Sequence, residues 1–405
     1  MRERRVGVKK IFRFIRICLL WFLLLFLCIA LYLYATDDSS SSPIPVFTNP
    51  SLAVYSAEKE NVKPLGRTYY ENGVRYFSHS GSGVEFICKG EYAMITLVDD
   101  SGGNYLGGHE PRFAIYKNGM LITDSILTEG EKIFHITLDG YNTETTVRII
   151  KLSEAQYSAM GIGDIAVYGK ERIRPTEEKN IKIEFIGDSI TCGYGIDEAD
   201  PYGYFSTATE NFTKSYAYIA AENLDADYSA VCFSGFGVYS GYTSDGRINA
   251  EDTLPLYYDK ACLLYGGREI LWDFSENHSD IIVINLGTND ASYCSKSASG
   301  RQEFTRRYAD FISQVRQYNP YAHILCVLGD MNNSMYSCIE QAVKNYSEAS
   351  FDNNVSVTTI AYKMGENDIV IDGHPGYMSN LSAANELTEK IRELIYGYNY
   401  NQGEN

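Results

Sequence analysis

The sequence has few cysteines and no pattern that would make them a site. Its 405 residues include nine cysteines, yet no Cys-x-x-Cys pair and no regular spacing occurs. This absence gives no support for a zinc site or for a disulfide framework. Cys88, Cys232 and Cys326 lie in apolar, strand-like runs, so we expect them to be buried free thiols.

Positive charge is scarce beyond the first residues. The formal net charge is −17, with 35 Lys and Arg against 52 Asp and Glu. Residues 1–16 alone contribute +6, which leaves −23 for the remainder. A body this acidic argues against binding to nucleic acid or to anionic lipid, and it favours a neutral or cationic substrate.

Charge is absent altogether from one long apolar run. Residues 17–35 follow seven Arg and Lys side chains and are numerous enough to span a bilayer as a helix. We therefore expect residues 1–36 to be a basic cytoplasmic stub and transmembrane anchor, followed by a linker at 37–50 and an extracytoplasmic body. The alternative is a secreted protein with a cleaved signal peptide, although the run is long for one and lacks an Ala-x-Ala-like site.

Helical periodicity is missing between about residues 50 and 172. Short strand-like runs recur instead, separated by turn residues such as Asn72-Gly73, Asn118-Gly119 and Asp139-Gly140. The runs cover residues 84–88, 92–98, 112–116, 120–124, 132–138, 145–151 and 163–168. This pattern predicts a β-sandwich domain at 51–172, whose role is either to pack against the next domain or to bind sugar.

From residue 180 the pattern alternates between strands and helices. We predict strands at residues 181–186, 228–233, 280–286, 323–328 and 355–360. Helical segments are predicted at residues 215–224, 301–319 and 381–395. The alternation indicates an α/β domain at 180–398, with a mainly parallel sheet and helices on both faces. In such sheets the site lies beyond the carboxyl ends of the strands.

Polar motifs follow four of these strands. They are Gly187-Asp188-Ser189, residues 233–237 (FSGFG), residues 287–290 (GTND) and residues 372–375 (DGHP). Each motif alone is ordinary turn chemistry, but four at one edge of one sheet predict an active site. A serine needs a base to take its proton, and of the six histidines only His374 lies in a loop at this edge.

The combination resembles the GDSL/SGNH hydrolase superfamily, whose four blocks match Ser189, Gly237, Asn289 and His374. The β-rich segment in front, its end at residues 146–154 (TVRIIKLSE) and the phrase IEFIGDSITCGYG at 183–195 are similar to carbohydrate esterase family two. The resemblance covers about residues 55–395. It implies a jelly-roll domain, then a three-layer α/β/α domain, and removal of acetyl groups from sugars.

The resemblance also implies the role of each residue. Ser189 would be the nucleophile, His374 the general base and Asp372 the group that orients the imidazole. Many SGNH enzymes place the aspartate three residues before the histidine, whereas here it lies two before. A backbone carbonyl is therefore the alternative orienting group, as in some members of family two.

The oxyanion of the tetrahedral intermediate would be bound by three donors. By resemblance these are the Ser189 N–H, the Gly237 N–H (with Gly235 as the alternative glycine) and the Asn289 amide. Gly237 can also be read as a turn residue, and Asn289 as a loop cap. The chemistry requires no metal and no organic cofactor.

These observations leave three functions to compare. The first is a surface-tethered O-acetyl esterase acting on carbohydrate, the second a lipase or thioesterase with the same catalytic set, and the third a glycan-binding protein without turnover. The tyrosine-rich insertion at residues 238–278 either shapes a sugar site or packs as core. The sequence predicts no oligomeric state.

Overall fold

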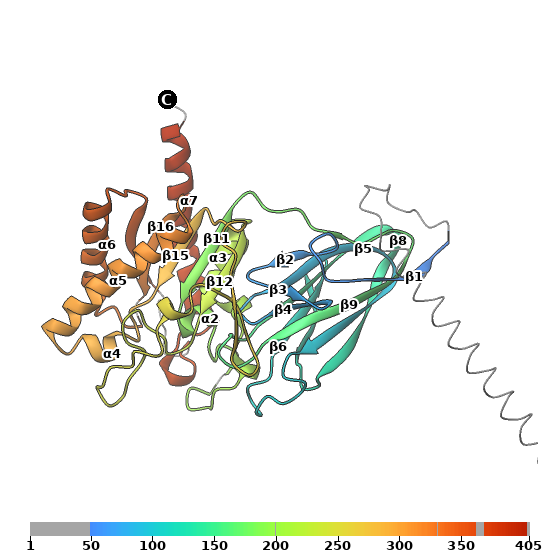
Figure 1. Ribbon diagram of the computed structural model, residues 1–405, viewed down its shortest axis with the longest axis horizontal. Helices are drawn as coiled ribbons and strands as arrows, with labels where there is room; N and C mark the ends of the chain where they lie inside the picture. Colours follow the sequence, from blue (N-terminus) through green and yellow to red (C-terminus); the bar gives the residue numbers. More distant parts are fainter. Residues whose placement is uncertain (1–48, 199, 330, 362–367, 403–405) are drawn as a thin grey trace, which may run out of the picture. The chain divides into compact units, whose positions relative to one another are not determined.

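The computed structural model describes residues 49–198, 200–329, 331–361 and 368–402 (Figure 1). The predicted anchor and most of the predicted linker lie outside these residues. Among the helices of the described part, none is both long and apolar enough to cross a bilayer. Residues Val46–Asn405 form one compact unit, which contains a β-rich region followed by an α/β region.

The β-rich region consists of strands, as its turn-separated runs predict, and these strands form one hydrogen-bonded network. Its main path runs in the order β3-β4-β9-β5-β8-β6-β7, and β1 pairs with β9 while β2 and β10 pair with β5. The strands are β1 (Ser51–Tyr55), β2 (Lys63–Leu65), β3 (Tyr69–Glu71), β4 (Val74–Phe77), β5 (Gly83–Asp99), β6 (Arg112–Lys117), β7 (Met120–Ile126), β8 (Glu131–Lys151), β9 (Met160–Gly169) and β10 (Arg174–Pro175).

Two of these strands are longer than predicted. The runs 84–88 and 92–98 are parts of β5, and the runs 132–138 and 145–151 are parts of β8, so the predicted turn at Asp139-Gly140 is wrong. The two strands pair along most of their length, with register irregularities next to Gly90. On β8, Gly140 pairs with Gly90 at this irregularity and has a φ of 103°, which glycine adopts without strain. Buried apolar side chains of β5 and β8 pack in one core of this region.

The other two turns are confirmed. Asn72-Gly73 joins β3 to β4 and Asn118-Gly119 joins β6 to β7. All four residues have positive φ, at 52°, 83°, 49° and 77°. Asn-Gly is the sequence that tolerates this backbone best, which is why these hairpins could be predicted.

The α/β region contains the five predicted parallel strands in the order β12-β11-β15-β16-β17. They are β11 (Lys182–Gly187), β12 (Asp227–Cys232), β15 (Ile281–Asn285), β16 (His323–Gly329) and β17 (Val355–Ile360). The longer helices are α3 (Tyr216–Asn223), α5 (Ala298–Tyr318), α6 (Tyr336–Ser350) and α7 (Tyr377–Gln402). Helix α6 was not predicted.

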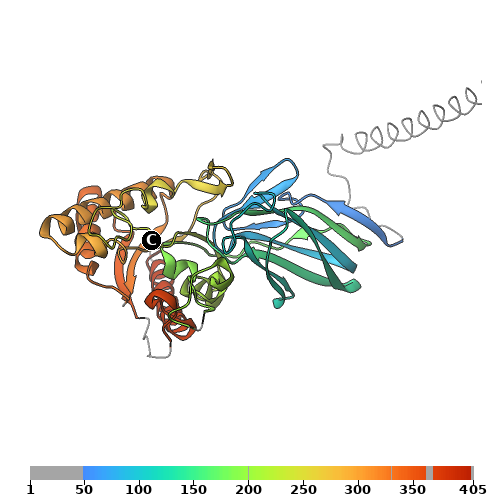
Figure 2. The same ribbon diagram turned by 90° about the horizontal axis from the view of Figure 1, so that it is seen from below.

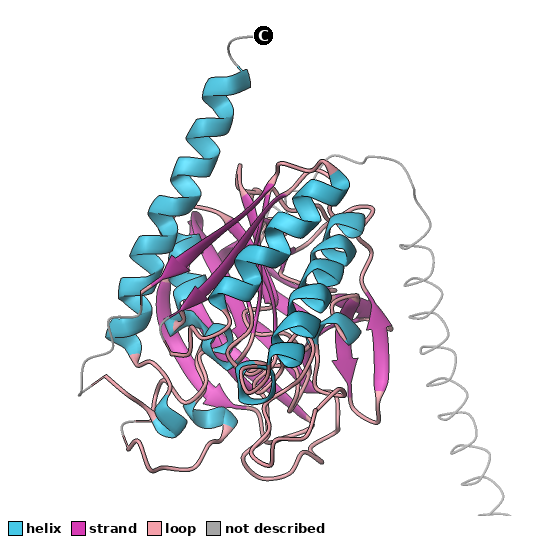
Figure 3. Cartoon of the chain, turned by 90° about the vertical axis from the view of Figure 1, so that its left-hand side faces the viewer, coloured by secondary structure: helices cyan, strands magenta, loops and turns pink. Residues whose placement is uncertain are grey.

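Helices cover both faces of this sheet, which confirms the layered α/β prediction. Alternate strand residues face opposite cores: Ile186 packs in the core that includes α5 and α6, while Phe185 packs in the core that includes α3 and α7. In Figure 2 the orange helices α5 and α6 and the red helix α7 lie on opposite sides of the strands. Figure 3 shows the same central strands among the helices.

Part of the segment 238–278 packs in the core, which is one of the two roles predicted for it. It contains η3 (Leu254–Leu256) and the hairpin of β13 (Lys260–Leu264) and β14 (Arg268–Leu271). Tyr258 is fully buried, so this tyrosine packs rather than faces a ligand. The remaining short helices are α2 (Ser189–Cys192), η1 (Thr207–Thr209), η2 (Phe212–Lys214), α4 (Ala291–Cys294) and η4 (Ile371–Gly373).

A buried ion pair joins the two regions. Arg67, from the β-rich region, lies 2.9 Å from the Glu184 carboxylate on β11, and neither side chain is exposed by more than 4%. The guanidinium also donates to the Tyr258 and Lys260 carbonyls. The remaining Glu184 acceptor sites receive hydrogen bonds from the Tyr258 and Ser229 hydroxyls, at 2.8 Å each. Both charges are therefore fully paired.

We expect Arg67→Met to lower the free energy of unfolding by about 3–5 kcal/mol, because it leaves the buried Glu184 carboxylate without its cation. Urea denaturation followed by circular dichroism measures this change. Arg306→Met is the matched control, since Arg306 forms an exposed pair with Glu303 and its loss should change stability much less. Equal effects of the two substitutions would contradict the role of the buried pair.

Candidate active site

The predicted nucleophile lies at the carboxyl end of strand β11, which pairs with β12 on one side and β15 on the other. Ser189 is the first residue of α2 and is 7% exposed. Asp188 caps this short helix by accepting a hydrogen bond from the Ile190 N–H at 3.1 Å. A Cβ on Gly187 would lie 1.9 Å from the Thr191 hydroxyl, so the turn requires glycine. The sequence thus forms a tight strand-to-helix turn that presents one hydroxyl.

His374, which is distant from Ser189 in the sequence, contacts the Ser189 hydroxyl. Its Nε2 lies 2.7 Å from Ser189 Oγ, and its Nδ1 lies 3.1 Å from the Ile371 carbonyl oxygen. Because a carbonyl can only accept, the Nδ1 atom carries the proton and Nε2 is free to accept the serine proton. The structure therefore brings the predicted nucleophile and base together in the geometry of a working pair.

In the structure the group in contact with His374 Nδ1 is the Ile371 carbonyl, which is the alternative named above, and not the Asp372 side chain. Asp372 has a φ of 54°, and its carboxylate accepts a hydrogen bond from the Tyr194 hydroxyl at 2.9 Å. The left-handed backbone directs the Ile371 carbonyl, not the carboxylate, to His374 Nδ1. Asp372 still acts on His374 through its charge, which raises the pKa of the imidazole, while burial, the larger effect, lowers that pKa.

Tyr194 is a site residue that the sequence reading missed. Its ring packs against the His374 ring with centroids 4.5 Å apart and stacks on Phe205 at 4.2 Å. The next residue, Gly195, lies against Ile371, where an added Cβ would be 2.3 Å from the Ile371 side chain. The CGYG sequence at 192–195 signals a tight turn, but only the folded chain reveals that this turn packs against His374.

The predicted oxyanion donors are not equally available. The Asn289 amide donates to the Phe236 carbonyl at 2.9 Å and makes a long contact of 3.4 Å with Asp188. The Gly237 N–H donates to the Asp252 carbonyl at 3.2 Å. Since this N–H is already engaged, the turn reading fits Gly237 better, and Gly235 is the glycine left to consider. The Ser189 N–H belongs to the first turn of α2, where N–H groups have no partner within the helix.

Asp290 holds the loop after β12 in place and was also missed. Its carboxylate accepts hydrogen bonds from the backbone N–H groups of Val238, Tyr239 and Ser240 at 2.8–3.0 Å. A Cβ on Gly237 would lie 2.2 Å from the Ser240 carbonyl oxygen and 2.6 Å from this carboxylate, so the position requires glycine. Burial raises the pKa of Asp290 to about 6, and the three N–H donors oppose that rise.

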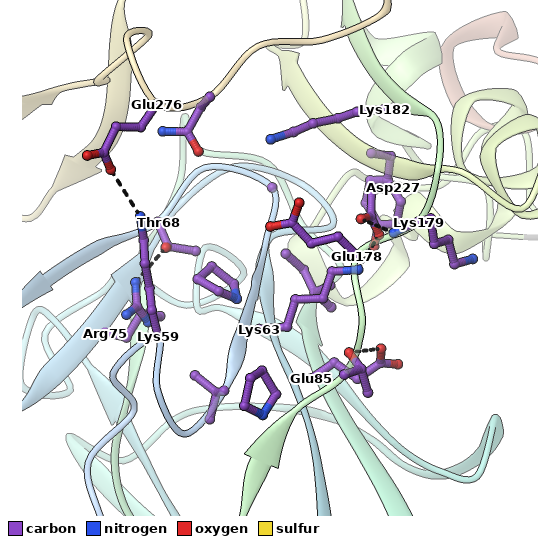
Figure 4. Close-up of a pocket in the computed structure, with 18 of the residues that line it drawn as sticks. Lys59, Lys63, Thr68, Arg75, Glu85, Glu178, Lys179, Lys182, Asp227 and Glu276 are labelled. Atoms are coloured by element: carbon purple, nitrogen blue, oxygen red, sulfur yellow. Dashed lines mark hydrogen bonds and ion pairs between the residues drawn. The ribbon is translucent and has the colours of Figure 1, made fainter. Parts of the chain in front are cut away.

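One large cavity of the described residues lies away from this site. It has a volume of about 1100 Å³, and Lys182, Asp227 and Asp280 line it at the amino ends of the parallel strands, opposite Ser189. Figure 4 shows Lys63 close to Asp227, and the two ions are 2.6 Å apart. Its wall is dominated by charged side chains, some of them already paired, and it contains neither Ser189 nor His374.

Comparison with known proteins defines the class of the α/β region. Residues 185–375 match the GDSL-like Lipase/Acylhydrolase family, so the predicted resemblance to this superfamily is confirmed. The match spans the strand before Ser189 through the residue after His374, and therefore the whole site described above.

Individual relatives indicate which kind of hydrolase within this family the chain resembles. The chain is 30% identical over 326 residues to the cellulase/esterase CelE of Acetivibrio thermocellus, covering 78% of this chain but only 37% of that protein. It is 23% identical to an acetylxylan esterase / glucomannan deacetylase of Cellvibrio japonicus, covering 84% and 90% of the two chains. These names and the family match identify the α/β region as a carboxylic ester hydrolase domain.

Solved structures extend the likeness to both regions. A family two carbohydrate esterase from Clostridium thermocellum, in complex with cellohexaose, superposes with a TM-score of 0.71. It is 27% identical and covers 82% of this chain and 99% of that one. The predicted resemblance to family two is therefore confirmed across the β-rich and α/β regions together.

We expect Asp372→Asn to lower kcat by less than about tenfold, because the Ile371 carbonyl still holds the imidazole, whereas an orienting aspartate typically contributes about 10⁴-fold. Removing the Asp372 charge should also lower the pKa of His374 further. Since the base must be neutral, the acid limb of the kcat/KM profile lies below the ordinary histidine value of 6.5 and moves to still lower pH in the variant.

Ester hydrolysis measured across pH tests this expectation. Tyr194→Phe is the matched control, since it removes only the hydroxyl that binds Asp372. A loss of about 10³-fold or more in Asp372→Asn would mean that the carboxylate, not the carbonyl, orients His374 during turnover.

Proposed function

We propose that this protein is a membrane-anchored, extracytoplasmic serine esterase that removes O-acetyl groups from carbohydrate. The observation that carries the proposal is the 2.7 Å contact between Ser189 Oγ and His374 Nε2 at the carboxyl edge of the sheet. The anchor rests on the apolar run at residues 17–35 and its basic flank.

The reaction follows from the donor and acceptor roles of the two side chains. Ser189 Oγ attacks the acetyl carbonyl carbon while His374 Nε2 takes the hydroxyl proton, and the sugar alcohol leaves with that proton. Water then repeats the sequence and releases acetate. The imidazolium that forms twice in each cycle is stabilised by the Ile371 carbonyl at Nδ1 and by the nearby Asp372 charge.

The tetrahedral intermediates need donors at the developing oxyanion. We assign this role to the Ser189 N–H and to the Asn289 amide, whose contact with Asp188 is long, at 3.4 Å, so that one amide proton can turn to the oxyanion. A glycine N–H of the loop after β12 would be the third donor. Gly235 is the better candidate for that third donor because the Gly237 N–H is bonded to Asp252. Loss of one such donor typically costs about 10²–10³-fold in turnover.

Three observations support carbohydrate as the alcohol part of the substrate. The relatives include an acetylxylan esterase / glucomannan deacetylase and a family two esterase bound to cellohexaose. The chain is strongly acidic, which suits an uncharged polymer better than an anionic one. Aromatic rings also gather beside His374, where Tyr194, Phe205 and Tyr157 contact one another in series.

Hydrolysis of 4-nitrophenyl acetate by the purified full-length chain tests the proposed chemistry. We expect Ser189→Ala and His374→Ala each to lower kcat by about 10³-fold or more, because each removes half of the nucleophile–base pair. The rate should fall as the acyl chain lengthens from acetate to butyrate and beyond.

Two results would contradict the proposal. Equal rates for the wild type and Ser189→Ala would mean that the serine is not a nucleophile and would move the search to glycan binding. A preference for long acyl chains would favour the lipase-type alternative.

The loop before η1 allows a test of sugar recognition. Tyr204 is 93% exposed and precedes Phe205, which stacks on Tyr194. We expect Tyr204→Ala to raise KM for acetylated xylo-oligosaccharides about 3–10-fold through lost stacking. Tyr321→Ala is the matched control, because Tyr321 is 87% exposed but precedes the amino end of β16. An equal effect of the two variants, or none, would remove Tyr204 from the sugar site.

A further inference from the structure

Two buried glutamates meet close to the nucleophile turn. Glu154 follows β8 at the end of a strand of the β-rich region, and Glu210 follows η1 in the α/β region. Both side chains are fully buried. One carboxylate oxygen of each lies within 4.8 Å of the other and of the Cys192 sulfur. Cys192 ends the short helix that begins with Ser189, so the pair adjoins the catalytic turn.

The hydrogen bonds of these carboxyl groups leave two oxygens without a donor. Glu154 Oε2 accepts from the Ser234 N–H at 2.7 Å, and Glu210 Oε2 accepts from the Glu154 N–H at 2.9 Å. The Oε1 atom of each accepts no hydrogen bond from any described residue. Two ionised carboxylates in this dry position would be costly, and a single proton between them supplies the missing donor and removes one charge.

Lys151 balances the charge that remains. Its ammonium donates to the Ser153 carbonyl, the Ser153 hydroxyl and the Glu154 carbonyl, at 2.7, 3.1 and 2.8 Å, so it has no proton left for either carboxylate. One ammonium beside one carboxylate and one carboxylic acid is electrically neutral. Lys151 therefore supplies no donor to either Oε1 atom, and the Ser234 hydroxyl beside Glu154 makes no hydrogen bond with any described residue.

The electrostatics agree with this arrangement. Burial raises the pKa of Glu154 to about 7, and burial together with the Glu154 charge raises the pKa of Glu210. Burial lowers the pKa of Lys151 to about 8. The other titratable groups that face the pair are Tyr157, Asp188, Cys192, Tyr194 and Cys232.

The pair is connected to the catalytic site through one loop. Ser234, whose N–H binds Glu154, is the second residue after β12. Two residues later the Phe236 carbonyl accepts the hydrogen bond that orients the Asn289 amide. Glu154 thus fixes the beginning of the loop that carries Gly235 and aims Asn289.

We propose that Glu154 and Glu210 share a single proton, and that this carboxyl pair positions the loop that carries the oxyanion-binding groups. The inference rests on the proposed esterase function. It makes Glu154 a positioning residue, delivered by the β-rich region to a site whose reacting groups all belong to the α/β region.

A divalent cation is the competing occupant of the same position. Two carboxylates and a thiolate at this spacing are a ligand set that zinc accepts. The position of Lys151 argues against a bound divalent cation, because its ammonium group would repel a second cation beside the same ligands. The ammonium also already balances the charge of a singly ionised carboxyl pair. Proton sharing therefore accounts for both orphaned oxygens and for the lysine.

Infrared difference spectroscopy of the full-length chain tests the shared proton directly. At neutral pH we expect the wild type to show the C=O stretch of a protonated carboxylic acid that is absent from Glu210→Gln, whose amide replaces the proton as donor. Glu389→Gln, at an exposed position on α7, is the control that should not change this band. No such band in the wild type would overturn the proposal. So would a stoichiometric divalent metal that is lost from Glu210→Gln.

Steady-state kinetics on an acetate ester test the positioning role. We expect Glu154→Ala to lower kcat at least about tenfold with KM changed less than about twofold, because the loop loses its anchor at Ser234 and the oxyanion donors shift. Glu154→Gln keeps an acceptor for the Ser234 N–H and should recover most of that loss. An unchanged kcat in Glu154→Ala would refute the role.

The pH profile provides a second measurement that does not depend on Glu154→Ala folding. In the wild type kcat should fall as pH rises through the pKa of the pair, because the second carboxylate then ionises. Glu210→Gln cannot ionise and should lack this fall, and an identical alkaline limb in both proteins would refute the proposal. If the wild type hydrolyses no ester, the proposed function fails, while the infrared band still decides whether the proton is shared.

Discussion

The buried pair of Arg67 and Glu184 is the interaction on which the arrangement of the two regions depends. Glu184 lies on strand β11, five residues before Ser189, and Arg67 reaches it from the β-rich region. Neither charge can be left alone in a dry interior, so the regions cannot separate without exposing or stranding both. The pair therefore fixes the β-rich region against the strand that carries the nucleophile.

This attachment lets the β-rich region shape a site whose reacting groups it does not supply. Arg112 of β6 binds Asp197 at 2.8 Å, and the Tyr157 ring contacts Phe205 at 5.0 Å. These contacts hold the loop that supplies the stacking partner of Tyr194. Glu154 reaches the loop after β12 from the same region. The β-rich region is thus a structural part of the active site as well as a neighbouring fold.

Using a backbone carbonyl to orient His374 has a chemical consequence. The Ile371 carbonyl fixes the proton on Nδ1 without placing a full negative charge against the ring. Burial then lowers the pKa of the imidazole, and the Asp372 charge raises it only in part. The net effect favours the neutral imidazole, which is the form that the proposed mechanism requires.

Local patterns were enough to predict the strands, the Asn-Gly hairpins, three of the long helices, and Ser189 with His374. Local patterns gave the wrong prediction where the structure depends on the pairing of two segments far apart in the sequence. Pairing of β5 with β8 made continuous strands out of runs that seemed separated by turns. Helix α6 was not predicted, although polar residues stand at both of its ends and its buried side chains recur at helical spacing.

The sequence by itself determined the class of fold and which residue types stand at the strand ends, because apolar periodicity and turn chemistry act over a few residues. Only the tertiary structure decided the partners of the polar groups. It placed the Ile371 carbonyl rather than Asp372 on His374, engaged the Gly237 N–H with Asp252, and brought Tyr194 and Glu154 to the site. Hydrogen bonds depend on ångström distances and direction between segments far apart in the chain, and these exist only after the cores have packed.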